Sequence, residues 1–252
     1  MNLSAKNRIS VTSMTIDASN SQTFWRHHGW WPLVFFLAIY GALGFGGFDR
    51  PLADRFFFDA MTQHWLGTGD GEWWARTLIH TAGGWFVRGV AVSALVIWAV
   101  SFRLFALREW RRPAGYVFVA MLLGTALVGT LKAFTNVDCP WDLAGYGGSD
   151  PYVALFADRP DGLPRAKCFP GAHSSSGFAL MALYFALRDR AHGLALWALG
   201  FALVIGAVFS FGQEARGAHF PSHDLASAGL VWYVELGLYA WMLRPPARVP
   251  QD

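Results

Sequence analysis

Apolar runs alternate with short polar segments along most of this chain. Six runs are long and almost free of Asp, Glu, Lys and Arg: 27–48, 89–102, 113–131, 168–187, 191–213 and 225–243. The shorter second run continues past Arg103 with four more apolar residues, and the last run holds one acid, Glu235. A helix needs about 20 apolar residues to cross a bilayer core. The pattern predicts an all-α polytopic membrane protein with six transmembrane helices in one domain over 27–245.

The composition agrees with a membrane protein. Hydrophobic residues make up 54% of the chain and charged residues only 15%, whereas soluble domains have about 25% charged residues. The formal net charge of +3 does not indicate nucleic-acid binding, because the basic residues recur between the apolar runs and form no patch. We therefore expect the lipid bilayer as a partner and no nucleic acid. The oligomeric state is not predicted.

The distribution of charge between the runs predicts the orientation. If six spans cross the membrane, the segments 1–26, 103–112, 188–190 and 244–252 share one side, with 11 basic and four acidic residues. The opposite segments hold nine basic and 12 acidic residues. By the positive-inside rule both termini are cytoplasmic. In a Gram-negative bacterium this predicts an inner-membrane protein whose long loops face the periplasm, with 1–26 as a disordered cytoplasmic tail.

Two long outward segments differ in character. Residues 49–84 are rich in Phe and Trp and lack a full span, so we expect helices lying at the membrane interface. Residues 135–172 are rich in Gly, Asp and Pro and show no helical period. Long irregular loops of this kind are commonly functional.

Three polar clusters fall on the outward side, each beside the end of a predicted span. The first runs from Lys132 to Asp142, the second from Cys168 to Ser174, and the third from Gln213 to Asp224. Three clusters on one face, each with His, Lys or Arg, indicate a functional site.

The residue types in these clusters suit phosphate chemistry. Lys and Arg neutralise phosphate oxygens. Gly171 and Ala172 would let backbone N–H groups approach an anion at the start of the fourth span. Two histidines can divide the remaining work, since one can attack phosphorus while the other protonates the leaving oxygen.

The three clusters resemble the signatures of the type 2 phosphatidic acid phosphatase family, K-x6-R-P, P-S-G-H and S-R-x5-H-x3-D. Lys132 and Pro140 fit the first signature, Pro170 and His173 fit the second, and His219 fits the third. The resemblance covers roughly 130–224 by motif, and the whole chain by its pattern of spans.

The resemblance implies a phosphatase of lipid phosphates or diphosphates that needs no metal or cofactor. His219 would attack phosphorus and form a phosphohistidine. His173 would protonate the leaving lipid oxygen and then activate water. Lys132 and Arg216 would hold the phosphate.

The chain departs from the family signatures at several positions. Cys139 stands in place of the first Arg, and Lys167 or Arg165 are candidates to replace that charge. Gln213 stands in place of the second Arg. The partner that orients His219 is left open between two residues. Spacing favours His223, which we rank first, whereas chemistry favours Asp224, because a carboxylate fixes an imidazole tautomer.

Two further interpretations concern residues of these clusters. His219 and His223, four residues apart, could bind zinc with His173 or Asp224 as a third ligand.

Cys139 and Cys168 are the only cysteines, and both lie on the outward side. In an oxidising compartment they are expected to form a disulfide, which would hold the first two clusters in register.

Two other functions remain open at this stage. A phosphotransferase of the same family would pass the phosphoryl group to another lipid. A non-catalytic membrane protein or transporter would more often have Gly- or Pro-broken polar spans or a charged midplane, and only Glu235 suggests that here. The two histidines at motif spacing favour an enzyme.

Overall fold

The computed structural model describes residues 21–244, and these are mostly helical. Two short strands form an antiparallel hairpin, β1 (Phe58–Asp59) and β2 (His64–Trp65). The α-helices are α2 (Trp31–Tyr40), α3 (Asp49–Phe56), α4 (Gly83–Val100), α5 (Arg111–Lys132), α6 (Ala172–Phe178), α7 (Ala182–Leu187), α8 (His192–Glu214) and α9 (Pro221–Met242). Segments of π-helix (Arg26–Trp30, Gly41–Phe45, Trp73–Ala82) and 3-10 helix (Gly69–Gly71, Phe105–Trp110, Pro140–Asp142, Ala179–Met181) extend or join them.

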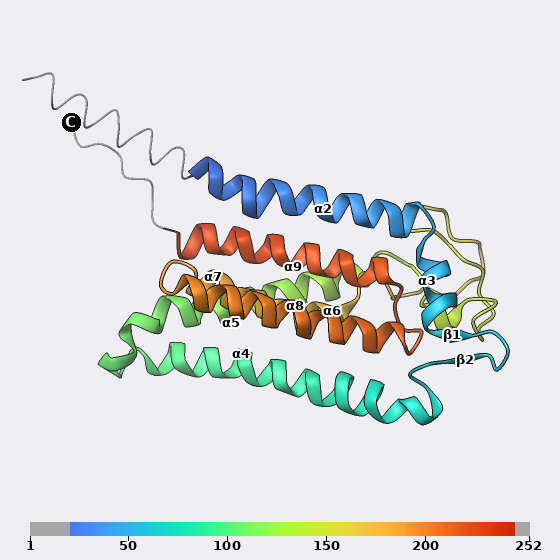
Figure 1. Cartoon of the computed structure of the whole chain (residues 1–252), viewed down its shortest axis with the longest axis horizontal. Coiled ribbons are helices and arrows are strands. Elements are labelled where there is room, and N and C mark those ends of the chain that lie inside the picture. The colour runs from blue at the N-terminus through green and yellow to red at the C-terminus, as the bar shows by residue number, and fades with distance from the viewer. Residues whose placement is uncertain (1–20, 245–252) are drawn as a thin grey trace, which may run out of the picture.

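The long helices lie side by side in a bundle (Figure 1). Helix α9 packs against α2, α5, α6 and α7, while α4 packs on α5 and α6 on α8. Buried side chains from these helices, such as Tyr116, Phe185 and Leu236, form one apolar core. Many large apolar side chains on the outer faces stay exposed, including Leu37 and Trp197, as expected where helices face lipid.

Four helical rods are long and apolar enough to cross a membrane: Ser21–Phe45, Gly69–Val100, Phe105–Lys132 and His192–Glu214. They correspond to the first, second, third and fifth predicted spans. The fourth predicted span is built from α6, Ala179–Met181 and α7, with 7, 3 and 6 residues. At about 1.5 Å per residue it is about 24 Å long, shorter than a bilayer core. Helix α9 is long enough to cross a bilayer core, with 22 residues, but it carries buried polar groups and is not among the four rods given above. The count of six spans stays a prediction.

The first helix begins earlier than the predicted boundary at residue 27. Residues from Ser21 onward are helical, because Phe24 anchors this end in the bundle. The Phe24 ring lies 5.7 Å from the ring of Tyr239, and the guanidinium groups of Arg188 and Arg244 lie over it at 4.5 and 4.4 Å. The predicted disordered tail therefore cannot extend to residue 26, and its residues 1–20 lie outside the described part of the chain.

The first outward loop is also shorter than predicted. Only α3 is a separate helix within 49–84, and the β1–β2 hairpin follows it. The segment Trp73–Ala82 instead continues directly into α4. No proline interrupts residues 72–100, so the helix propagates through them and the aromatic residues there belong to a long rod.

Candidate functional site

The three polar clusters meet at one end of the bundle, near α3, the hairpin and the long loop that precedes α6 (Figure 1). One backbone hydrogen bond joins each pair of clusters. Trp141 N–H donates to Gly217 O at 2.9 Å, Cys168 N–H to Val137 O at 2.9 Å, and Gly171 N–H to His223 O at 3.1 Å. The loops that carry the predicted site residues are therefore fixed to one another.

His219 and Asp224 form a buried pair at the centre of this end. His219 lies in the turn after α8, and Asp224 lies in the first turn of α9, which Pro221 begins. The His219 Nδ1 and Asp224 Oδ1 atoms are 2.6 Å apart. A carboxylate on Nδ1 fixes the tautomer of the ring and stabilises its cation. The Nε2 atom of His219 is then the nitrogen available for chemistry.

Gly171 provides the space for this pair. A Cβ atom at position 171 would lie 2.4 Å from Asp224 Oδ1, 2.7 Å from Ser174 Oγ and 2.8 Å from His219 Cε1. Real Cβ atoms essentially never approach other atoms this closely. The chain between the second cluster and α6 therefore packs directly against the His219–Asp224 pair, and only glycine fits there.

Two cations act on His219. Burial lowers the pKa of the His219 imidazole well below its usual value of 6.5, and the positive charges of Lys132 and Arg216 lower it further. Lys132 ends α5, and Arg216 lies in the turn after α8. The Nη1 atom of Arg216 donates to the side-chain oxygen of Gln213 at 3.4 Å. These charges would attract an anion to the face of His219.

His173 is held between two rings in the first turn of α6. Its ring stacks on His80 with centroids 4.2 Å apart and on Phe209 with centroids 4.5 Å apart. Its Nε2 atom is buried and has no hydrogen-bond partner among the described residues. That nitrogen is therefore not committed to another side chain of the described residues.

Two of the predicted contacts differ from expectation. His223 does not hold His219, because their ring centroids are 6.2 Å apart, so the ranking of His223 above Asp224 is corrected. In the first turn of α9, residue 224 is the one that points back to His219, and the ring of His223 packs edge-on against Phe169 and Phe220. The Gly171 amide is used by the His223 carbonyl and is not free for an anion.

The other predicted phosphate ligands lie at different distances from the site. Ala172 begins α6 beside His173. Lys167 is exposed on the long loop, and Arg165 donates to Ala133 O at 3.0 Å from the surface. Lys132 and Arg216 are thus the cations that the described structure brings to His219.

A comparison with protein families gives a match over this part of the chain. The family model of the PAP2 superfamily matches residues 113–246, which is more than half of the 252 residues. The chain belongs to the PAP2 superfamily. The predicted resemblance is confirmed at this level, and membership supports a phosphatase-type enzyme. Comparisons with curated proteins and with solved structures give no significant match.

Several residues that contact the predicted site residues of this PAP2 protein, or the loops that carry them, were not identified from the sequence. His80 has no motif spacing, and only the fold brings it against His173. Asp49 accepts hydrogen bonds from the backbone N–H and hydroxyl of Ser222 and so holds the start of α9. Arg159 forms a bidentate pair with Asp138 at 2.6 and 2.7 Å and so fixes the long loop. These contacts join residues 21 to 173 positions apart, and a single sequence gives no signal for them.

Cys139 and Cys168 of this PAP2 protein are joined by a disulfide with Cα atoms 5.0 Å apart. The bridge ties the first cluster to the second at the place where the family motif has an arginine. Beside it, Cys168 N–H donates to Val137 O, and the hydroxyl of Thr135 donates to Phe169 O. The bridge and these bonds together hold Lys132 and His173 on the same side of the site.

Removing the bridge should destabilise the protein. The cysteines are 29 positions apart, and in the loop-entropy picture closing such a loop is worth about 3–4 kcal/mol. The Cys139→Ser/Cys168→Ser double variant should therefore melt at a lower temperature than wild type in detergent. Reductant should lower the melting temperature of wild type and leave the variant unchanged. Mass spectrometry that found two free thiols in protein purified without reductant would contradict the bridge.

The lowered pKa of His219 predicts the pH dependence of a PAP2 reaction at this site. Its ring stays neutral until the pH falls well below 6.5, so if His219 is the nucleophile, its loss by protonation should begin only there. We expect the acid limb of kcat/KM to lie well below pH 6.5 in steady-state assays. A limb near 6.5 that persists for substrates of different phosphate pKa would contradict this.

No group of three or more His, Cys, Asp or Glu side chains within residues 21–244 is arranged to hold a metal ion. His219 Nδ1, one of the proposed zinc ligands, already contacts Asp224. Lys132, Arg216 and the imidazole of His219 are the groups that the described arrangement of this PAP2 site offers to an anion.

Proposed function

We propose that the chain is a membrane-embedded phosphatase of lipid phosphates or diphosphates that works through a phosphohistidine. The observation that carries this proposal is the buried His219–Asp224 pair, 2.6 Å apart, on which the charges of Lys132 and Arg216 act. A histidine held at Nδ1 by a carboxylate presents Nε2 as a nucleophile. Two cations beside it can neutralise the charge on the transferred phosphoryl group.

The first half-reaction transfers the phosphoryl group to the enzyme. His219 Nε2 forms a bond to phosphorus while the bond from phosphorus to the lipid oxygen breaks. His173, which is protonated when the phosphate anion is bound beside it, gives a proton from Nε2 to that oxygen, so the lipid leaves as an alcohol or as a monophosphate. Asp224 stabilises the positive charge that develops on the His219 ring, and Lys132 and Arg216 bind the phosphoryl oxygens.

The second half-reaction restores the enzyme. His173, now neutral, takes a proton from water as the water oxygen attacks phosphorus, and the bond from phosphorus to His219 Nε2 breaks. Inorganic phosphate leaves, and His173 is again protonated. Each histidine thus ends the cycle in the form in which it began.

The surroundings of His173 support a lipid as the leaving group. A cavity of about 450 Å³ adjoins this residue, between α4, α5 and α6. Its walls are largely apolar, with Val87, Phe118 and Met121 among the residues that line it. A hydrocarbon chain attached to the leaving oxygen would fit this lining, whereas a soluble phosphate ester would gain little from it.

The same proposal includes an orientation. Both termini would be cytoplasmic, and the His219 end would face the periplasm across a bacterial inner membrane. The charge asymmetry between the two sets of loops supports this assignment. Labelling of single introduced cysteines in residues 145–165 should occur from outside the cell.

The experiment that tests the function is phosphate release from a panel of lipids by purified protein in detergent. The panel should contain phosphatidic acid, phosphatidylglycerol phosphate, a polyprenyl diphosphate and a phosphorylated lipid A. We expect release from at least one lipid by wild type. Transfer of labelled phosphate to an added acceptor lipid, without release, would indicate a phosphotransferase instead. No turnover or transfer with any lipid would contradict an enzymatic role.

The reaction should proceed without a divalent metal. Lys132 and Arg216 supply the positive charge that a metal ion provides in many other phosphatases. Phosphate release by wild type should therefore be unchanged in EDTA. Strong inhibition by EDTA that Zn²⁺ reverses would instead favour the binding of zinc by His219 and His223.

A further inference from the structure

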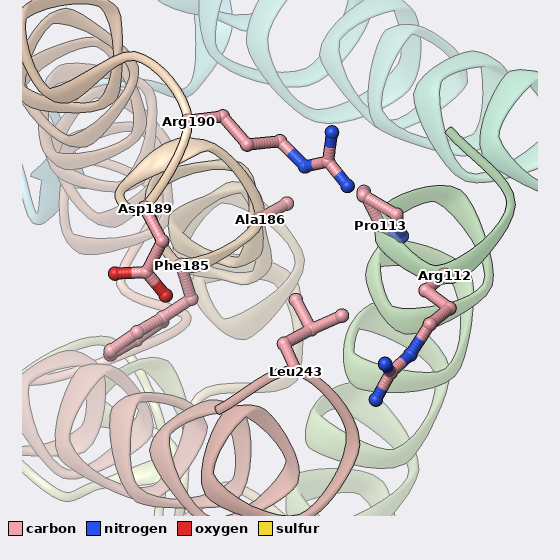
Figure 2. Close-up of a pocket in the computed structure, with 7 residues that line it drawn as sticks. All are labelled: Arg112, Pro113, Phe185, Ala186, Asp189, Arg190 and Leu243. Atoms are coloured by element: carbon pink, nitrogen blue, oxygen red, sulfur yellow. The ribbon is translucent and has the colours of Figure 1, made fainter. Parts of the chain in front are cut away.

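A second cavity lies at the opposite end of the bundle from His219. It has a volume of about 300 Å³ and is lined by Arg112, Pro113, Phe185, Ala186, Asp189, Arg190 and Leu243 (Figure 2). Pro113 lies in the first turn of α5, which ends at Lys132. At about 1.5 Å per residue, Pro113 and Lys132 are about 28 Å apart. This cavity is therefore separate from the proposed catalytic site.

Two arginines give this cavity an excess of positive charge. Within residues 21–244 neither Arg112 nor Arg190 forms an ion pair. Arg190 donates to Glu109 O at 3.0 Å and Arg112 donates to Met242 O at 2.5 Å. A guanidinium has five N–H donors, so donors remain on both side chains. The start of α5 adds the positive end of its helix dipole.

The one acid in the cavity is already balanced by neighbours. Asp189 accepts a hydrogen bond from Tyr239 at 2.5 Å and lies 3.5 Å from the Arg188 guanidinium. In Figure 2 the Arg190 side chain extends toward Pro113, and the Asp189 carboxylate points to the other side of the cavity. The side of the cavity next to Pro113 is therefore the part that would attract an anion.

An apolar cavity lies next to this cationic side. It has a volume of about 440 Å³ and shares Pro113 and Ala186 with the first cavity. The rest of its lining is almost entirely apolar: Val90, Ser93, Ala94, Ile97, Leu107, Trp110, Ala114, Val117, Leu183 and Leu187. Arg190 lines the first cavity and Trp110 the second. The Arg190 guanidinium lies 5.8 Å from the centre of the Trp110 ring, so this cation lies close to both cavities.

We propose that the two adjacent cavities together form a binding site for an anionic phospholipid. The phosphate of the lipid would bind Arg190, with Arg112 adding attraction from the far side, and one acyl chain would lie in the apolar cavity. A free anion could use the arginines but not the 440 Å³ apolar space, and a zwitterionic lipid would bring a cation against them. With the predicted orientation, this lipid belongs to the cytoplasmic leaflet, where basic pockets between helices commonly bind anionic lipids. The site does not depend on the proposed reaction.

Native mass spectrometry of the detergent-purified, delipidated full chain can test this proposal. Phosphatidylglycerol, phosphatidylcholine with the same acyl chains, and glycerol phosphate would be added separately. We expect phosphatidylglycerol adducts on wild type and few with the other two compounds. Arg190→Ala should weaken phosphatidylglycerol binding by about tenfold or more, as loss of a charge-assisted hydrogen bond predicts, and Arg190→Lys should retain part of it.

Arg108→Ala provides the matched control, because Arg108 is exposed on the segment between α4 and α5 that also carries Trp110 but lines neither cavity. It should bind phosphatidylglycerol like wild type. Melting temperatures without lipid would show whether each variant is folded. Equal binding by folded Arg190→Ala and wild type, or equal binding of the two lipids, would overturn the proposal. Binding of glycerol phosphate as tight as that of the lipid would show an anion site without a lipid chain, and would also overturn it.

Discussion

Replacement of His219 by alanine is expected to abolish phosphate release. No other described side chain combines a carboxylate on one ring nitrogen, a second nitrogen free for attack and two cations acting on it. Loss of the nucleophile in covalent catalysis lowers kcat on the order of 10⁴-fold or more. The measurement is steady-state phosphate release by His219→Ala and wild type, prepared in the same detergent.

A trapping experiment complements this rate measurement. Wild type quenched during turnover with labelled substrate should carry an acid-labile, base-stable phosphoryl group, and His219→Ala should carry none. His80→Ala serves as the comparison, because His80 stacks on His173 but lies outside the proposed covalent step, so it should still be labelled. Substantial turnover by His219→Ala would refute the mechanism.

Replacement of Asp224 by asparagine is expected to have the second-largest effect. The Asp224 carboxylate fixes the proton of His219 on Nδ1 at 2.6 Å. An amide can present its NH₂ group to Nδ1 and so favour the wrong tautomer. The corresponding substitution in a Ser-His-Asp triad lowers kcat about 10⁴-fold, and we expect a loss of similar order here, measured as kcat with KM changed far less.

His223→Gln provides the matched comparison for Asp224→Asn. The two residues are adjacent, and both are buried, but only Asp224 contacts His219. Because the His223 side chain packs on rings and uses its backbone carbonyl to hold Gly171, the glutamine variant should lose about tenfold or less in kcat, like a packing change. If His223→Gln were the more damaging substitution, the assignment of the orienting residue would be reversed.

The sequence predicted the long helices of the bundle well, but it predicted poorly the residues at which they begin and end. Charge-free runs report the length of apolar surface, so they located the long rods. They could not locate where a helix begins, because that depends on contacts across the bundle. Phe24, for example, extends the first helix through its packing on Tyr239 and two arginines. Likewise, aromatic residues at 73–82 looked interfacial, but the uninterrupted helix carries them into the second rod.

Motif spacing predicted which loops form the site, but not all of their contacts. It brought Lys132, His173 and His219 into one hypothesis, and the structure places all three at the same end of the bundle. It could not decide between His223 and Asp224, because adjacent residues in a helix point about 100° apart and the entry angle of α9 decides which one faces His219. Nor could spacing reveal that His80, 93 positions before His173 in the chain, stacks on its ring.

The contact of Gly171 with the His219–Asp224 pair has a consequence for local dynamics. The amides of Trp141, Cys168 and Gly171 each donate across a boundary between two clusters, and Gly171 packs against the His219–Asp224 pair without room for a Cβ atom. Such mutually locked segments open as one cooperative unit. In hydrogen exchange these three amides would then share one opening free energy, so a fluctuation that exposes the first loop to solvent also dismantles the pair around His219.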